Sequence, residues 1–417
     1  MAVVRPLAAL RPRPELAAEV AAVPYDVVDT EEARALAAGN PHSFLHVTRA
    51  EIDLPPGTDA HAPAVYAAGR AALERFVAEG VLVRDGEPAL YVYRLTLGEH
   101  SQVGVMGCCS VDEYDTDRIK KHEKTRPDKE DDRTRHLLAL ACHPEPVFLT
   151  YRAEAKIDRL VARVLDAEEP LYDFSAPDGV EHTVWRVPAG GLADDLSAAF
   201  ADKVPALYVA DGHHRCAAAS RARAARQEGH PEHDGSEPYN VFLAVVFPHD
   251  QVRILPYNRV VHDLAGQTPE DFLERLAARW EVTPDAEPEA DGRGRFAMYL
   301  AGRWYGLAAP RELVEAEDPV ESLDAAILQR EVLAPLLGVD DPRTSARIDF
   351  VGGIRGSEEL ARRVDRRAAA GTPAVAFALH PVSVEELMAV ADAGRVLPPK
   401  STWFEPKLRS GLTVHEF

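Results

Sequence analysis

The chain has little of what marks a disulfide-bonded or membrane-spanning protein. Only four of its 417 residues are cysteines, and no two of them make a C-x-x-C pair. We therefore expect no disulfide framework and no structural zinc site, and we interpret Cys108 and Cys109 as small buried side chains of a strand. No apolar run approaches the roughly 20 residues that span a bilayer, and no long apolar segment follows Met1. We expect a cytoplasmic protein without a membrane partner.

Positive charge is also scarce. Lysine and arginine number 47 against 68 aspartates and glutamates, a net charge of -21. Such a field repels nucleic acid, so we expect no nucleic-acid partner. The hydrophobic fraction of 46% and charged fraction of 28% are those of an ordinary globular protein, long enough for two or three domains.

Lysine is the rarer of the two cationic residues, with eight among 47. Four of the eight lie within ten residues, Lys120 to Lys129, and Lys400 and Lys407 lie near the C-terminus. Lysine is a compact point charge suited to binding phosphate, so both segments become candidate sites. Because residues 115–135 are mostly charged, we expect them to stay outside the core.

Apolar runs of strand length alternate with helical patterns, which predicts a mixed α/β (α+β) fold. Asp29 or Thr30 is expected to cap a helix that starts near Glu31. The predicted strand pairs are 89–97 with 102–111, and 240–248 with 252–261. A buried strand is expected over 146–151, a further strand over 206–210, and a helix over 216–227.

The strongest chemical motif is Asp211-Gly-His-His-Arg215, placed between the strand and the helix. A helix N-terminus offers free amide groups to an anion, Gly212 allows close approach, and Arg215 can bind phosphate through two hydrogen bonds. We take His213 and His214 as part of the same site. The alternative is that Asp211 only caps the helix and the two histidines are exposed.

A second motif is Lys120-Lys-His-Glu-Lys-Thr-Arg126. A carboxylate among cations suits a general base or magnesium ligand beside a polyphosphate, so Glu123 is a catalytic candidate and His122 is grouped with it. The candidate phosphate ligands here are Lys120, Lys121, Lys124 and Arg126. Because Arg126 stands where H-E-x-x-H requires histidine, a zincin-type protease is excluded. A solvated, salt-bridged loop is the alternative.

The C-terminal segment Pro398–Lys407 combines rigid turns, aromatic residues and two lysines, Lys400 and Lys407. It is interpreted either as a docking strand or as a secondary part of the site. The glycine-rich turn at 351–356 is interpreted as structural in the main. No Walker A, Rossmann, G-x-S-x-G or protein-kinase signature occurs.

Four ordered motifs, Pro24-Tyr-Asp-Val27, 121–125, 210–215 and 398–407, make the chain resemble the bacterial and archaeal domain-of-unknown-function family 1015 over nearly its whole length. The Asp-Gly-His-His-Arg turn further resembles the nucleotide-binding core of ParB-like proteins, sulfiredoxin and free-serine kinases. The resemblance implies such a core at 111–265, with α/β extensions at 1–110 and 266–417, the tail docking back on the core.

The same resemblance implies a kinase that transfers a phosphoryl group from ATP or ADP to a free amino acid, with L-serine giving O-phosphoserine. It implies Mg²⁺ as cofactor near Asp211, nucleotide at Gly212 to Arg215, and Glu123 as base. Alternatives are a non-catalytic, nucleotide-responsive regulatory protein, or a phosphatase using the same site. Cys216 lies in the expected helix and does not suit sulfiredoxin chemistry. A homodimer is left open.

Overall fold

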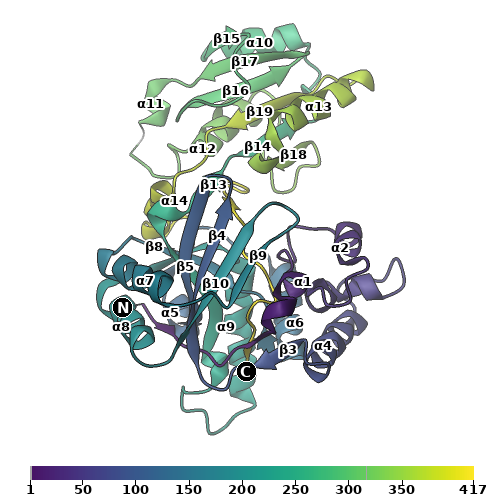
Figure 1. Ribbon diagram of the computed structural model, residues 1–417. Coiled ribbons are helices and arrows are strands. Elements are labelled where there is room, and N and C mark those ends of the chain that lie inside the picture. The colour runs from purple at the N-terminus through teal and green to yellow at the C-terminus, as the bar shows by residue number, and fades with distance from the viewer. Residues whose placement is uncertain (1, 316) are drawn as a thin grey trace. The chain divides into compact units, whose positions relative to one another are not determined.

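The computed structural model describes residues 2–315 and 317–417, which form two compact units (Figure 1). The first unit contains the chain up to Val252 together with Pro406–Phe417, and the second contains Arg253–Glu405. The fold is mixed α/β, with a large mixed sheet in the first unit. The division expected from the sequence has its boundaries after residues 110 and 265. These positions differ from the boundaries of the two compact units.

The first unit is built on a nine-stranded sheet of order β6-β11-β8-β12-β5-β4-β10-β9, with β1 pairing to β5. Its strands are β1 (Val4–Arg5), β4 (Ala89–Leu97), β5 (His100–Ser110), β6 (Ile119–Lys120), β8 (Val147–Tyr151), β9 (Tyr172–Ser175), β10 (Glu181–Pro188), β11 (Leu207–Asp211) and β12 (Val241–Pro248). The hairpin predicted from 89–97 and 102–111 is confirmed as β4 and β5. Strand β8 confirms the buried strand predicted at 146–151.

Helices pack on this sheet and against one another. They are α1 (Ala17–Val20), α2 (Thr30–Ala37), α3 (Leu45–Thr48), α4 (Pro63–Ala78), α5 (Val111–Asp115), α6 (Pro127–Leu140), α7 (Ala155–Ala167), α8 (Leu192–Lys203) and α9 (His213–Glu228). Helices α7 and α8 bury Leu160 and Phe200 in the core of the sheet. Two short strand pairs, β2 (Leu10–Pro12) with β3 (Leu82–Arg84) and β7 (Cys142–His143) with β21 (His415–Glu416), complete the unit. All four cysteines are buried and unbridged, as expected.

Helix α6 corrects one expectation. Although residues 115–135 are mostly charged, Asp132 and Arg133 are buried within α6. Their charges are compensated: Asp132 accepts hydrogen bonds from Arg133 at 2.7 Å, from His61 at 2.7 Å and from Tyr66 at 2.8 Å. Burial alone would raise the pKa of Asp132, but the neighbouring Arg133 charge and these hydrogen bonds lower it to about 2. Charge alone therefore does not keep a segment at the surface when its partners fold over it.

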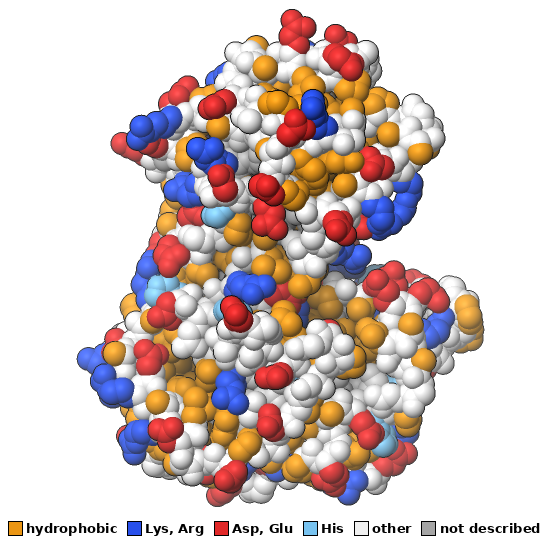
Figure 2. Space-filling model, turned by 45° about the horizontal axis from the view of Figure 1, so that its top comes forward, with side chains coloured by type: hydrophobic (Ala, Val, Ile, Leu, Met, Phe, Trp, Pro, Cys, Tyr) orange, Lys and Arg blue, Asp and Glu red, His pale blue; other side chains and the backbone are white. Residues whose placement is uncertain are grey.

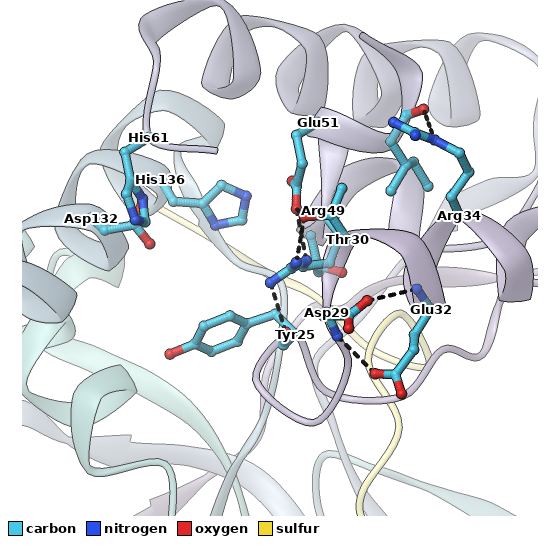
Figure 3. Close-up of polar contacts among 12 residues, drawn as sticks. Tyr25, Asp29, Thr30, Glu32, Arg34, Arg49, Glu51, His61, Asp132 and His136 are labelled. Carbon is cyan, nitrogen blue, oxygen red and sulfur yellow. Dashed lines mark hydrogen bonds and ion pairs between the residues drawn. The ribbon is translucent and has the colours of Figure 1, made fainter. Parts of the chain in front are cut away.

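The loop before α2 is held by polar contacts (Figure 3). Asp29 caps α2 through the backbone N–H of Glu32, whose carboxylate accepts the backbone N–H of Asp29, confirming the predicted cap. The Arg49 guanidinium donates to the Tyr25 carbonyl and to the Thr30 hydroxyl, both at 3.2 Å. These bonds fix the position of Tyr25 within the Pro24–Val27 motif.

The second unit contains a six-stranded sheet of order β15-β17-β16-β19-β14-β18. Its strands are β14 (Tyr257–Val261), β15 (Glu281–Pro284), β16 (Arg295–Leu300), β17 (Arg303–Ala308), β18 (Ile348–Gly352) and β19 (Val375–Leu379), and a separate pair joins β13 (Arg253–Leu255) to β20 (Trp403–Glu405). Its helices are α10 (Pro269–Ala277), α11 (Arg311–Val314), α12 (Asp324–Leu328), α13 (Gly356–Ala369) and α14 (Val384–Asp392).

The predicted pairing of 240–248 with 252–261 is wrong. Strand β12 pairs with β5 and β8 inside the first unit, whereas β14 pairs with β18 and β19 in the second. Because β12 is almost wholly buried, it needs a partner strand on each side, and those partners come from distant parts of the sequence.

Within the two described ranges, no helix is both long enough and apolar enough to cross a membrane. On the face drawn in Figure 2, acidic and basic side chains are interspersed.

Gly107 tests the packing of the large sheet. A Cβ at this position would lie 2.7 Å from Leu90 Cδ2 and 2.8 Å from the Arg5 carbonyl oxygen, which belongs to the paired strand β1. Gly107→Ala should lower the free energy of unfolding by about 1–3 kcal/mol, as overpacking does. The check is urea denaturation beside Gly86→Ala, where an added Cβ meets no described atom within 4 Å. Equal stability of the two variants would contradict the packing described here.

Candidate functional site

The turn between β11 and α9 is built around a glycine. Gly212 has a φ of +99°, and a Cβ there would lie 2.8 Å from Arg215 Nε, so other residues are disfavoured by both conformation and space. Gly212 occupies the N-cap of α9 and, having no side chain, makes no side-chain cap hydrogen bond. Asp211 precedes the N-cap, so the capping position that the alternative gave it is taken by Gly212. The N-terminus of a 16-residue helix favours an anion.

The Asp211 carboxylate is directed to cations instead. Its Oδ2 accepts a hydrogen bond from Lys407 Nζ at 3.0 Å, and its Oδ1 lies 3.9 Å from Arg215 Nη2. Burial by itself would raise the pKa of Asp211, but the charges of Lys407 and Arg215 outweigh it and hold that pKa well below its usual range. Asp211 is thus an anion at any physiological pH.

Lys407 reaches this position from the other end of the chain, 196 residues after Asp211. Its side chain is 14% exposed. Of the two C-terminal lysines, the structure brings Lys407 to the turn, whereas Lys400 lies in the second unit with its Nζ 5.7 Å from the centre of the Tyr257 ring. The tail thus both forms strand β20 and supplies a residue to the site.

The lysine-rich loop lies against the first turn of α9. Strand β6 runs parallel to β11, with Lys120 opposite Tyr208, so the two strands end at the same edge. Two hydrogen bonds then tie the loop to the helix. The backbone N–H of His122 donates to His213 Nε2 at 3.5 Å, and that of Arg126 donates to His214 Nε2 at 3.1 Å. His213 and His214 therefore position the loop that carries Glu123.

His122 and His213 form a buried pair next to Glu123. Their rings meet edge to face with centres 4.4 Å apart, and Glu123 Oε2 lies 3.8 Å from His213 Nδ1. Burial lowers the pKa of His122 to about 4 and lowers the pKa of His213 well below its usual value. Both rings are therefore neutral at pH 7. The Glu123 side chain is 49% exposed, so a ligand can reach it.

The cations of the loop are less closely gathered than the sequence suggests. Lys121 Nζ donates to the Tyr114 carbonyl at 2.8 Å and lies 3.3 Å from Asp117, so it contacts α5 and its C-terminal end. Arg126 binds Asp128 at 2.8 Å. Lys124 is exposed, and Lys120 is half-buried on β6.

Arg215 lies deeper than a surface phosphate ligand would. Its side chain is 10% exposed, and its Nη1 donates to the Pro146 carbonyl. Arg215, Arg133 and Glu145 line a small cavity of about 20 Å³, which is room for one or two water molecules. Arg215 Nε and Arg133 Nη1 are buried without a hydrogen-bond partner among the described residues.

Sequence reasoning missed Glu145 and the role of Tyr25. The buried Glu145 carboxylate accepts the backbone N–H of Tyr25 and the Ser410 hydroxyl, both at 2.9 Å. Tyr25 also lies beneath Arg133, whose guanidinium carbon is 4.0 Å from the ring centre. The Pro24–Val27 motif was a signal for Tyr25, but a lone glutamate between two prolines gave none for Glu145.

The donor set does not fit a magnesium ion on Asp211. Both oxygens of this carboxylate face cationic groups, Lys407 and Arg215, which would repel a divalent ion. Glu123, on the neighbouring loop, stands beside two histidine rings, and imidazole nitrogen is not a donor that Mg²⁺ prefers. We therefore derive no step through magnesium.

The Asp211–Lys407 pair predicts a pH dependence of stability. The pKa of Asp211 is lower in the folded chain than in the unfolded chain, so its ionised carboxylate stabilises the fold at a pH above the unfolded pKa of about 3.9. This contribution is lost as the pH falls further. Lys407→Met should therefore cost most stability near pH 6 and progressively less on acidification below about pH 4. Urea denaturation across this range measures the difference. A Lys400→Met control should leave the slope unchanged, and a pH-independent cost for Lys407→Met would contradict the assignment.

The position of Arg215 predicts a large effect on stability. Arg215→Met removes a cation from beside Asp211 and Glu145, and loss of one partner of a buried ion pair typically costs about 3–5 kcal/mol. Arg221→Met, on the same helix but in exposed pairs with Glu130 and Asp131, should cost about 0–1 kcal/mol. Denaturation of both variants measures the two losses of stability. Equal losses would show that the buried contacts of Arg215 stabilise the fold no more than the exposed pairs of Arg221 do.

The chain was compared with known proteins. No curated protein matches it. Solved structures align over 74% of the chain: a free serine kinase in complex with AMP (14% identity, 91% of that chain, TM-score 0.33) and SbnI with a C-terminal truncation from Staphylococcus aureus (13%, 86%, TM-score 0.38). Another is a conserved hypothetical protein from Pyrococcus furiosus (15% identity, 74% of this chain, 94% of that one, TM-score 0.34). Similarities this low carry no argument about function.

The family comparison is decisive by contrast. The family described as "Protein of unknown function (DUF1015)" matches residues 4–326, well over half of the chain. Three of the four motifs that suggested the same family, at 24–27, 121–125 and 210–215, lie within this range. The chain belongs to the DUF1015 family.

Proposed function

We propose that this protein is a small-molecule phosphotransferase, which transfers a phosphoryl group from ATP or ADP to the hydroxyl of a free amino acid, L-serine being the first acceptor to test. The observation that carries the proposal is the convergence of Glu123, the Asp211–Lys407 pair and the start of α9, whose N-cap is the glycine Gly212. One place thus combines an accessible carboxylate, a fixed cation and a helix N-terminus.

The start of α9 supplies the phosphate-binding part of the proposal. Its amide groups and dipole favour an anion, Gly212 leaves room for close approach, and Lys407 brings positive charge within 3.0 Å of Asp211. Lys120 and Lys124, on the neighbouring loop, are proposed to offset charge on the transferred group. Arg215 serves in this scheme by holding Asp211 and the Pro146 carbonyl from within.

Glu123 is the proposed general base. The acceptor hydroxyl oxygen forms a bond to the terminal phosphorus, the bond from that phosphorus to the nucleotide oxygen breaks, and the hydroxyl proton passes to the Glu123 carboxylate. His213, whose Nδ1 lies 3.8 Å from Glu123 Oε2, is kept neutral by burial, which lowers its pKa well below the usual value. His122, packed edge to face on His213, is proposed as a positioning residue.

Mass spectrometry of reaction mixtures tests the function directly. The purified chain is incubated with Mg²⁺, ATP or ADP, and a pool of free amino acids. The proposal expects a phosphorylated amino acid, foremost O-phosphoserine. Nucleotide binding without any product would favour the regulatory alternative, and release of phosphate from added O-phosphoserine without nucleotide would favour a phosphatase.

Glu123→Gln separates chemistry from binding. Loss of a general base costs about 10²–10⁴-fold in rate, and nucleotide affinity should stay unchanged because the base acts on the acceptor. Steady-state kinetics at saturating acceptor and calorimetry with nucleotide provide the two readouts. Asp131→Asn, an exposed carboxylate paired with Arg221, is the matched control and should retain full turnover. Parental turnover by Glu123→Gln would remove Glu123 from the mechanism.

A further inference from the structure

A second cluster of metal-ligating side chains lies at the other end of α9, within the first unit. It consists of His230, His233 and Glu237, which follow α9, and Tyr239 in the short 3₁₀ turn Pro238–Asn240 that leads into β12. One donor atom from each of the first three residues lies within 4.8 Å of the others. We propose that this loop cluster is a binding site for a borderline divalent transition-metal ion, with Zn²⁺ as the first candidate.

The donor atoms lie close enough together to bind one ion. His233 Nδ1 lies 2.8 Å from Glu237 Oε2, and His230 Nδ1 lies 3.4 Å from Glu237 Oε1. Zinc bonds of about 2.0–2.1 Å at tetrahedral angles place neighbouring ligand atoms roughly 3.3 Å apart. The 3.4 Å distance matches this spacing, and the 2.8 Å distance would have to widen by roughly 0.5 Å to admit the ion.

The hydroxyl of Tyr239 marks the point on which both rings converge. Its oxygen is 3.2 Å from His230 Nδ1 and 3.0 Å from His233 Nδ1, and the phenol has only one proton to donate. The phenol oxygen thus lies beside the same two imidazole nitrogens that neighbour the Glu237 carboxylate. Mixed nitrogen and oxygen donors of this kind select zinc, nickel or cobalt over magnesium.

The carboxylate of Glu237 is already oriented by its neighbours. It accepts the backbone N–H groups of Asp234 at 2.8 Å and Gly235 at 3.0 Å, and the Asn240 amide at 2.9 Å. Such outer hydrogen bonds are typical of metal-ligating carboxylates. Gln227 Nε2 lies 3.0 Å from His233 Nε2, and rotation of this amide would let its oxygen accept the ring N–H when Nδ1 holds metal.

The arrangement gives the ion a structural role. The ligands lie on the loop between the last turn of α9 and the first residue of β12, so one ion would fasten that loop across its length. This site is separate from the residues of the proposed phosphotransferase, and neither proposal requires the other.

Zinc titration of the chelator-treated full chain tests the proposal. Calorimetry should show one equivalent of zinc bound by the parent. The His230→Ala/His233→Ala double variant should lose that equivalent. Its zinc affinity should fall by more than the roughly 10–100-fold that follows from losing a hydrogen-bond partner of a ligand. His42→Ala is the matched control. His42 forms a surface pair with Glu19 at 2.8 Å, and this pair supplies only two possible metal ligands.

Two results would overturn the proposal. One is a parent chain that takes up no zinc, and the other is a double variant that binds zinc as the parent does, which would direct attention to His122, Glu123 and His213. If the double variant does not fold, side-chain NMR of the parent decides. Zinc should then shift the imidazole signals of His230 and His233, and unshifted signals for these two would refute the site.

Discussion

The ion pair of Asp211 with Lys407 is the interaction on which the first unit's site depends. A partly buried carboxylate such as Asp211, at the end of β11, is costly unless cations compensate its charge, and Arg215 at 3.9 Å is a distant partner. Lys407, at 3.0 Å, is the close one. Because Lys407 follows the whole second unit in sequence, the site is complete only when residues 406–417 have returned to the first unit. That return is secured by backbone pairing as well, through Ser410 with Ala22 and Val414 with Leu10.

The two histidines of the turn explain how a charged loop is kept in one position. Each accepts a backbone N–H from the loop that contains Glu123, so the start of α9 and this loop form one structure. Burial also keeps both His122 and His213 neutral, because it lowers the pKa of each ring. A half-exposed carboxylate beside neutral rings is an arrangement that suits the general base we propose for Glu123.

Local patterns predicted the parts of this structure that local forces determine. The strand–turn–helix junction at Asp211–Arg215, the β4–β5 hairpin and the Asp29 cap all follow from residues adjacent in sequence. The burial of α6 could not be predicted, since it depends on His61 and Tyr66 reaching Asp132 from 71 and 66 residues away. The partners of β12 and the contact between Lys407 and Asp211 are likewise set by long-range packing. Glu145 is the clearest case, because its hydrogen bonds to Tyr25 and Ser410 join residues that are far from it in sequence.

A double-mutant cycle on Asp211 and Lys407 tests the central claim most directly. The free energies of unfolding are measured for the parent, Asp211→Asn, Lys407→Met and the double variant, following the transition of the first unit. If the pair holds the site together, the losses in unfolding free energy of the two single variants, added together, should exceed the loss of the double variant. The expected difference is about 1–3 kcal/mol, as for coupling between residues in contact. Losses that add to within about 0.5 kcal/mol would show that the two residues act independently and would contradict the account.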